Sequence, residues 1–164
     1  MKRIKTLLLS VIFISLLTSC KPAEDVFASD GVAPEKESKP VSEITAAIIE
    51  GGDFPEMTAK TADDLEYKYG LDADGVVEAS FYVNPAGTNP DEIVVLKMAS
   101  ADKAAEAAEF FEKYAQERLK SWRDYLPAEV YKLENAVIET NGDYVVMFIC
   151  GDGEKAKEIF EESV

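Results

Sequence analysis

The chain lacks histidine altogether and has only two cysteines among its 164 residues. Histidine is the commonest general base at neutral pH, so its absence excludes the usual Ser-His-Asp and Cys-His arrangements and most zinc-ligand sets. Basic residues are also few, because 17 Lys and Arg stand against 32 Asp and Glu, for a net charge of −15 at pH 7. Phosphate backbones repel so acidic a chain, and we expect no nucleic-acid partner.

Long apolar runs are missing as well, and the longest one lies near the start. Residues 6–17, TLLLSVIFISLL, follow the basic start MKRIK. The run is shorter than the ~20 apolar residues that a membrane-spanning helix needs, and the pattern is typical of a signal peptide. Its end, LTSC, resembles a bacterial lipobox, which predicts cleavage before Cys20 and lipid attachment to the Cys20 thiol. The alternative is a plain secretory peptide with a chance cysteine.

These patterns divide the chain into three parts. Residues 1–19 form the predicted lipoprotein signal peptide, residues 20–41 a lipidated cysteine and a disordered acidic tether, and residues 42–164 one domain. Two acyl chains on one cysteine suffice for stable anchoring, so we expect the protein on the extracytoplasmic face of the cell membrane, held there through lipid. Cleavage would lower the net charge to −18 and leave Cys150 without a disulfide partner.

Hydrophobic periodicity and turn residues predict an α+β fold for the domain. Short helices are expected after Ser42 and from Thr61 to Gly70, each with a capping residue and a glycine stop. Two strands should follow at residues 76–83 and 92–98, and then a long helix at residues 100–126. A second pair of strands, with its turn at Asn141 and Gly142, is expected at residues 136–150, and a last short helix at residues 153–162. The expected sheet has four largely antiparallel strands in two hairpins, packed by the long helix and short flanking helices.

Candidate site residues are few, and most have a structural explanation. In LDADG, Asp72, Asp74 and Gly75 match part of a calcium-binding loop, but the first ligand and the final glutamate are absent, which favours a capped turn. Asp152 in GDG is expected to cap the last helix, and Cys150, without a histidine beside it, to be a small core residue. We therefore predict no catalytic residue, no metal and no cofactor.

One aromatic residue is singled out as a possible exposed contact. Phe111 and Trp122 recur at helical spacing along the predicted long helix, which is typical of a core stripe. Tyr125 lies off that stripe, and we expect it at the surface. Acidic residues are too numerous for any pair of them to indicate a glycosidase site.

The stretch KSWRDYLPAEVYKLENAVIETNGDYVVMFIC, with EIVVLKM and the long helix before it, resembles a known family. It is similar to lipoproteins of Gram-positive anaerobes that carry domain of unknown function 4358. The resemblance covers most of residues 43–162 and is most specific in the WxxYLP element formed by Trp122, Tyr125, Leu126 and Pro127. It implies a lipoprotein with one domain, and it supplies no catalytic residues.

Two classes of function remain open from the sequence. One is a non-catalytic surface module that binds or scaffolds an envelope protein or a small extracellular ligand, and we favour it. The other is an envelope hydrolase built from carboxylates or a Ser-Lys type pair. The sequence names neither a partner, a substrate nor an oligomeric state.

Overall fold

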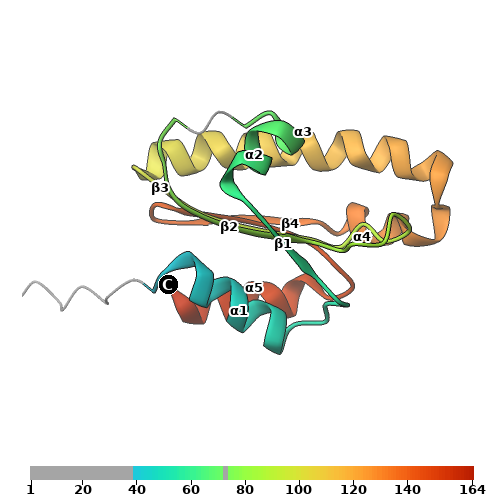
Figure 1. The fold of residues 1–164 in the computed structure, drawn as a ribbon, viewed down its shortest axis with the longest axis horizontal. Helices are drawn as coiled ribbons and strands as arrows, with labels where there is room; N and C mark the ends of the chain where they lie inside the picture. The colour runs from blue at the N-terminus through green and yellow to red at the C-terminus, as the bar shows by residue number, and fades with distance from the viewer. Residues whose placement is uncertain (1–38, 72–73) are drawn as a thin grey trace, which may run out of the picture. The chain divides into compact units, whose positions relative to one another are not determined.

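The computed structural model describes residues 39–71 and 74–164. Within these residues the chain forms a single α+β domain with five α-helices and one sheet of five strands (Figure 1). The elements follow in the order α1 (Val41–Gly51), β1 (Thr58–Lys60), α2 (Ala62–Tyr69), β2 (Val76–Val83), β3 (Glu92–Met98), α3 (Ala101–Tyr125), the 3₁₀ turn η1 (Pro127–Glu129), α4 (Val130–Glu134), β4 (Val137–Asn141), β5 (Tyr144–Ile149) and α5 (Gly153–Ser163).

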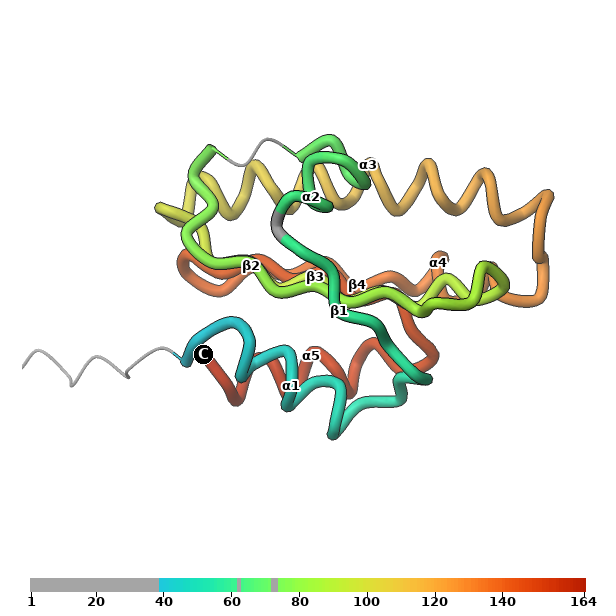
Figure 2. The backbone as a smooth tube through the Cα atoms, viewed as in Figure 1, coloured from blue at the N-terminus to red at the C-terminus, as the bar shows by residue number. Residues whose placement is uncertain are grey.

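The sheet has the strand order β1-β2-β3-β5-β4, and every neighbouring pair is antiparallel. Strands β3 and β5 lie side by side in the interior, with Val95 opposite Val146. Helices α2 and α3 cover one face of the sheet, and α1 and α5 cover the other (Figures 1 and 2). Strand β5 is buried along its whole length and β3 everywhere except at Lys97, which explains why most residues of these two strands are apolar.

Alternation along β3 divides the interior into two cores. Val94 and Leu96 pack with Phe111 of α3, and Ile93 and Val95 belong to the core beneath α1 and α5. Successive side chains of a strand point to opposite faces, so one strand supplies both cores. Each helix packs on the sheet with the apolar side of its surface facing the strands.

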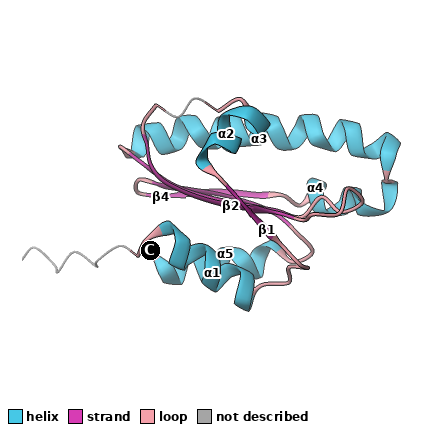
Figure 3. Cartoon of the chain, viewed as in Figure 1, coloured by secondary structure: helices cyan, strands magenta, loops and turns pink. Residues whose placement is uncertain are grey.

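The predicted fold class is confirmed, but the sheet has five strands and not four. Strand β1 is not predicted from the sequence; it is a three-residue edge strand whose side chains are all exposed. It lies against β2, with Ala59 opposite Tyr82 (Figure 3). This strand is held by backbone pairing, and its sequence therefore shows no alternation of hydrophobic and polar residues from which a strand could be predicted. The five-residue helix α4 was missed as well, because it is shorter than two turns.

Several local predictions hold at the level of single residues. Thr61 forms a capping box with Asp64, and Gly70 ends α2 in the left-handed conformation at φ 70°. Asp152 caps α5 by accepting a hydrogen bond from the backbone N–H of Lys155. Helix α1 begins at Val41, two residues before the expected start, with Pro40 and not Ser42 at its N-cap.

The β4–β5 hairpin is confirmed, and its turn is displaced by one residue from the prediction. Asn141 pairs with Tyr144, so the two turn residues are Gly142 and Asp143. Gly142 has φ 59°, and glycine at the first central position suits a two-residue hairpin turn. Among the described residues, no helix is long and apolar enough to cross a bilayer.

Candidate functional site

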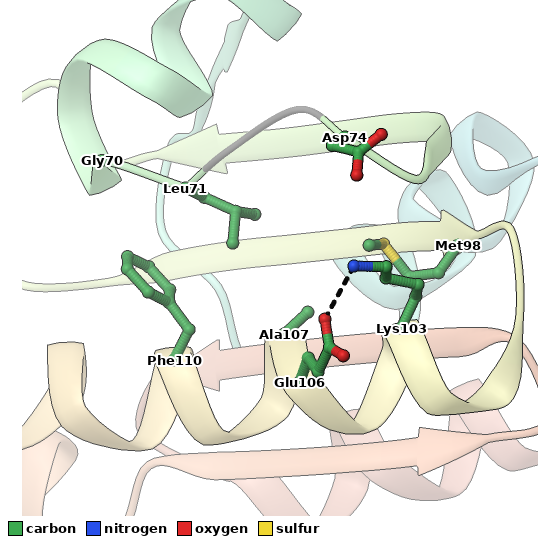
Figure 4. Close-up of a pocket in the computed structure, with 8 residues that line it drawn as sticks. All are labelled: Gly70, Leu71, Asp74, Met98, Lys103, Glu106, Ala107 and Phe110. Carbon is green, nitrogen blue, oxygen red and sulfur yellow. Dashed lines mark hydrogen bonds and ion pairs between the residues drawn. The ribbon is translucent and has the colours of Figure 1, made fainter.

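A pocket of about 370 Å³ opens where the α2–β2 connection meets the end of β3 and the first turns of α3 (Figure 4). Its lining combines apolar and charged side chains with one glycine: Gly70, Leu71, Asp74, Met98, Lys103, Glu106, Ala107 and Phe110. The apolar part is rigid, since Met98 and Ala107 are core residues of the sheet and of α3. The charged part lies toward solvent, and Lys103 Nζ is 2.9 Å from Glu106 Oε2.

The residues around this pocket do not form an activated nucleophile. Ser100 and Lys103 lie close together at the start of α3, and Ser100 Oγ accepts a hydrogen bond from the backbone N–H of Lys103 at 3.3 Å. The hydroxyl therefore serves as the N-cap of α3, and the Lys103 ammonium faces the Glu106 carboxylate. A serine nucleophile needs a neutral base that takes its proton, and this geometry does not supply one.

Glu92, the first residue of β3, is the centre of a buried charged cluster between the sheet, α2 and α3. Its side chain has no exposure to solvent. Tyr69 donates a hydrogen bond to Oε1, Arg118 pairs with Oε2, and Lys68 Nζ lies 2.8 Å from Oε1. The Tyr114 hydroxyl lies 3.3 Å from Oε2. Two cations and two phenols from two helices thus converge on one carboxylate.

Burial dominates the electrostatics of the Glu92 cluster. It raises the pKa of Glu92 from its usual 4.5 to about 7, against the opposing effect of Lys68. The same desolvation lowers the pKa of Arg118 to about 10 and lowers that of Lys68. The pKa of Tyr114 is raised by burial and by the adjacent Glu92 charge. None of the eight residues that line the pocket in Figure 4 belongs to the cluster, and the charges of the cluster act on one another and hold α2 and α3 to the sheet.

A second buried charge pair joins the residue before β3 to α4. Lys132 Nζ lies 2.6 Å from Asp91 Oδ2, 3.0 Å from Glu129 Oε2 and 3.3 Å from Asn89 Oδ1. Asp91 is 2% exposed, and its other carboxyl oxygen, Oδ1, is buried without a hydrogen-bond partner. Burial raises the pKa of Asp91. A buried acid with one oxygen unsatisfied is unusual in a folded protein and calls for an explanation.

Neither buried charge cluster is predicted from the sequence, where Glu92 falls within an apolar strand and Asp91 within the turn before that strand. The partners of Glu92 on α2 and α3 are 23 and 26 residues away, and Lys132 is 41 residues from Asp91. No local spacing encodes such contacts. The available signal was a pair of consecutive acids, Asp91 and Glu92, at the start of a strand that was predicted to be buried.

The predicted site residues are widely separated in the fold. Tyr125 is 61% exposed at the end of α3, with its ring edge-to-face against Trp122 at 5.7 Å, and its role as a contact remains a prediction. Cys150 is 2% exposed, and burial, with Asp91 next in effect, raises the pKa of its thiol to about 12. This agrees with the predicted core role. Cys20 lies outside the described residues.

The calcium-like stretch is only partly visible. Asp72 lies outside the described residues, Asp74 lines the pocket, and Gly75 has φ 83°. Among the residues that the structure does describe, no group of three or more Cys, Asp or Glu side chains is arranged to hold a metal ion.

Comparison with known proteins gives one match. The model of a family described as a domain of unknown function, DUF4358, matches residues 50–150. This range runs from the last turn of α1 to the end of β5 and includes both buried charge clusters and the pocket. No curated protein and no solved structure matches the chain.

Proposed function

This chain belongs to the DUF4358 family, and we propose that it is a lipid-anchored, non-catalytic binding module on the extracytoplasmic face of the cell membrane. The lipid would be carried by Cys20, as LTSC after a short apolar run indicates. The acidic body has no basic patch in its sequence with which to grip anionic lipid, so the acyl chains would supply the attachment.

The observation that carries the binding role is the exposed aromatic end of α3. Tyr125 is held edge-to-face on Trp122, so a large ring is presented to solvent with limited freedom. Tyr and Trp are enriched in protein interfaces because they bury much area at a small entropic cost. The end of α3 also lies at the opposite end of the domain from the start of α1 (Figure 1).

The arrangement of charges favours binding over catalysis. An enzyme site gathers perturbed ionisable groups around a concave surface. Here Glu92 and Asp91, whose pKa values are raised, are enclosed by protein, and neither lines the pocket in Figure 4. The alternative is an envelope hydrolase that uses carboxylates or a Ser-Lys type site, and for the Ser-Lys form the capping role of Ser100 argues against a nucleophile at that position.

The test is photo-crosslinking in cells with a matched control. A photoreactive phenylalanine analogue replaces Tyr125 in one variant and Tyr67 in the other. Tyr67 is a suitable control because it is a tyrosine of the same domain, on α2, and is 92% exposed. We expect a discrete crosslinked envelope protein from position 125 and none from position 67. Truncation of Tyr125 to alanine should weaken the isolated interaction about 30-fold, the effect of a ~2 kcal/mol hot spot.

Equal, diffuse labelling from both positions would contradict the proposed contact surface. The enzyme alternative is tested separately, with ester, phosphoester, glycoside and peptide substrates and the chain lacking its first 20 residues. Turnover that follows the protein through purification and is lost on one substitution would overturn the non-catalytic role.

A further inference from the structure

We propose that Lys132 and Asp91 become joined by an intramolecular amide bond, with Glu129 transferring protons during its formation. The bond would link Lys132 Nζ to Asp91 Cγ and tie α4 to the start of β3. It is a self-modification within one domain and does not depend on the binding role proposed above.

The geometry places the reacting groups together. Lys132 Nζ is 2.6 Å from Asp91 Oδ2. Because a carboxyl C–O bond is about 1.2 Å long, Nζ lies within about 3.8 Å of Cγ, close to the ~3–3.5 Å of a near-attack arrangement. Glu129 Oε2 is 3.0 Å from the same nitrogen and can accept its proton directly. Holding amine, acid and proton carrier in contact makes the condensation a unimolecular step.

Burial distinguishes this pair from the other lysine ion pairs of the described residues. The Lys132 and Asp91 side chains are 11% and 1% exposed. By comparison, Lys68 beside Glu92 is 31% exposed, and Lys103 beside Glu106 is 39% exposed. Water competes with an amine for an activated carboxyl group and stabilises the separated ions, so exclusion of water favours amide formation at this pair alone.

Asp91 Oδ1 supplies an independent observation. It is buried without a hydrogen-bond partner, although its neighbour Oδ2 contacts Lys132. A buried carboxylate with one unsatisfied oxygen carries a large desolvation cost because it is charged. An amide at the same position has no charge and carries a smaller cost. Burial of Oδ1 therefore favours the amide over the carboxylate at Asp91.

The protonation states fit a slow reaction. Burial raises the pKa of Asp91 and so favours the neutral carboxylic acid. The hydroxyl group of this neutral acid can leave as water once it is protonated. Burial also disfavours the Lys132 ammonium, but its hydrogen bonds to Asp91 and Glu129 prevail and raise the pKa of Lys132. The ion pair is thus the resting form, and proton transfer from nitrogen to carboxylate gives the reactive neutral pair as a minor form. An amide, once formed, does not revert under these conditions.

The reaction balances without an oxidant or a co-reactant. The neutral Lys132 amine attacks Asp91 Cγ, and the N–Cγ bond forms as the carbonyl π bond opens. Glu129 takes the proton from nitrogen and returns it to the departing hydroxyl group. The Cγ–OH bond breaks, one water leaves, and a secondary amide remains. Glu129 ends in the protonation state in which it began.

The experiment is peptide mapping of the full chain, purified under native conditions and incubated at pH 7 before denaturation. Trypsin does not cut after an acylated lysine. The cross-link therefore joins residues 69–97, which contain Asp91, to residues 124–155, which contain an uncut Lys132. We expect this branched peptide at the summed mass of its two arms less one water. Separate peptides 69–97, 124–132 and 133–155 at unmodified mass, after prolonged incubation, would overturn the proposal.

Variants separate the roles of the three residues. Lys132→Arg keeps the positive charge and should abolish the branched peptide, whereas Lys157→Arg, which changes a more exposed ion pair, should leave it intact. Glu129→Gln retains both reacting groups and should slow cross-linking about a hundredfold, the size of one general acid–base contribution. A branched peptide in Lys132→Arg, or a loss of ammonia with the link at Asn89, would refute the assignment to Lys132 and Asp91.

Discussion

The stability of this domain should fall as the pH rises through the titration of Glu92. The fully buried carboxyl group has its pKa raised from 4.5 to about 7 by burial. The folded state therefore binds the Glu92 proton more tightly than the unfolded chain does. For an acid with a raised pKa, the free energy of unfolding contains a contribution that is fully present below pH 4.5 and is lost as the pH approaches 7. The difference of 2.5 pKa units corresponds to about 3 kcal/mol.

The perturbation that isolates this contribution is Glu92→Gln. Glutamine has nearly the shape of the protonated glutamic acid and does not titrate. Other acids also change the stability with pH, and subtraction of the two unfolding curves removes their common part. We expect the unfolding free energy of the wild type minus that of Glu92→Gln to fall by about 3 kcal/mol between pH 4 and pH 8.

The assay is urea unfolding at closely spaced pH values, with equal m-values required of both proteins. Glu109→Gln, on the exposed side of α3, is the control for the loss of one surface charge. A difference that rises with pH would contradict a raised pKa for Glu92. It would mean that Lys68, Arg118 and the two phenols outweigh the desolvation of Glu92 and hold its pKa below 4.5.

Four further outcomes are expected. Cys20→Ser should release the protein from the membrane fraction, and sedimentation of the variant with membranes after a high-salt wash would rule out the lipid anchor. Alkylation of native Cys150 at pH 8 should be about a thousandfold slower than that of a thiol with the usual pKa of 9.0, because burial raises its pKa to about 12; rapid labelling would contradict this. Ser100→Ala should destabilise the domain by about 1 kcal/mol through loss of the α3 cap, measured by urea unfolding, and no change would argue against the cap. Calcium should raise the melting temperature by less than about 5 °C, and a larger rise would indicate that the loop containing Asp74 binds calcium.

The parts of the fold that were predicted correctly are those encoded within a few residues. Thr61 was predicted to cap α2 and Gly70 to end it in the left-handed conformation, and both do so; the capping box that Thr61 forms with Asp64 was not predicted. Phe111 and Ala115 recur at the spacing of one helical turn and are both buried along α3. In each case the physical cause lies in neighbouring residues, so a sequence pattern is sufficient evidence.

The parts that were missed depend on contacts between distant segments. Strand β1 exists because the open edge of β2 offers backbone groups to Ala59 and its neighbours, and no side-chain pattern records this pairing. The convergence of Lys68 and Arg118 on Glu92 likewise follows from the layering of α2 and α3 on the sheet. A glutamate at the start of a strand is ordinarily a surface residue, and only the completed fold encloses it.

Asp91 and Glu92 show how one local pattern acquires two separate roles. In the sequence the two acids look like the polar end of a turn before IVVLKM. In the fold β3 is an interior strand, and Glu92 lies opposite Ile149 of β5, so even the first residues of β3 are covered. Adjacent residues of an extended chain point in opposite directions, and the two carboxyl groups enter different environments. Glu92 meets cations on α2 and α3, whereas Asp91 meets Lys132 on α4 and lies near enough to Cys150 to raise its pKa. Titration of Glu92 and cross-linking of Asp91 should therefore be independent, and Glu92→Gln should leave the branched peptide unchanged.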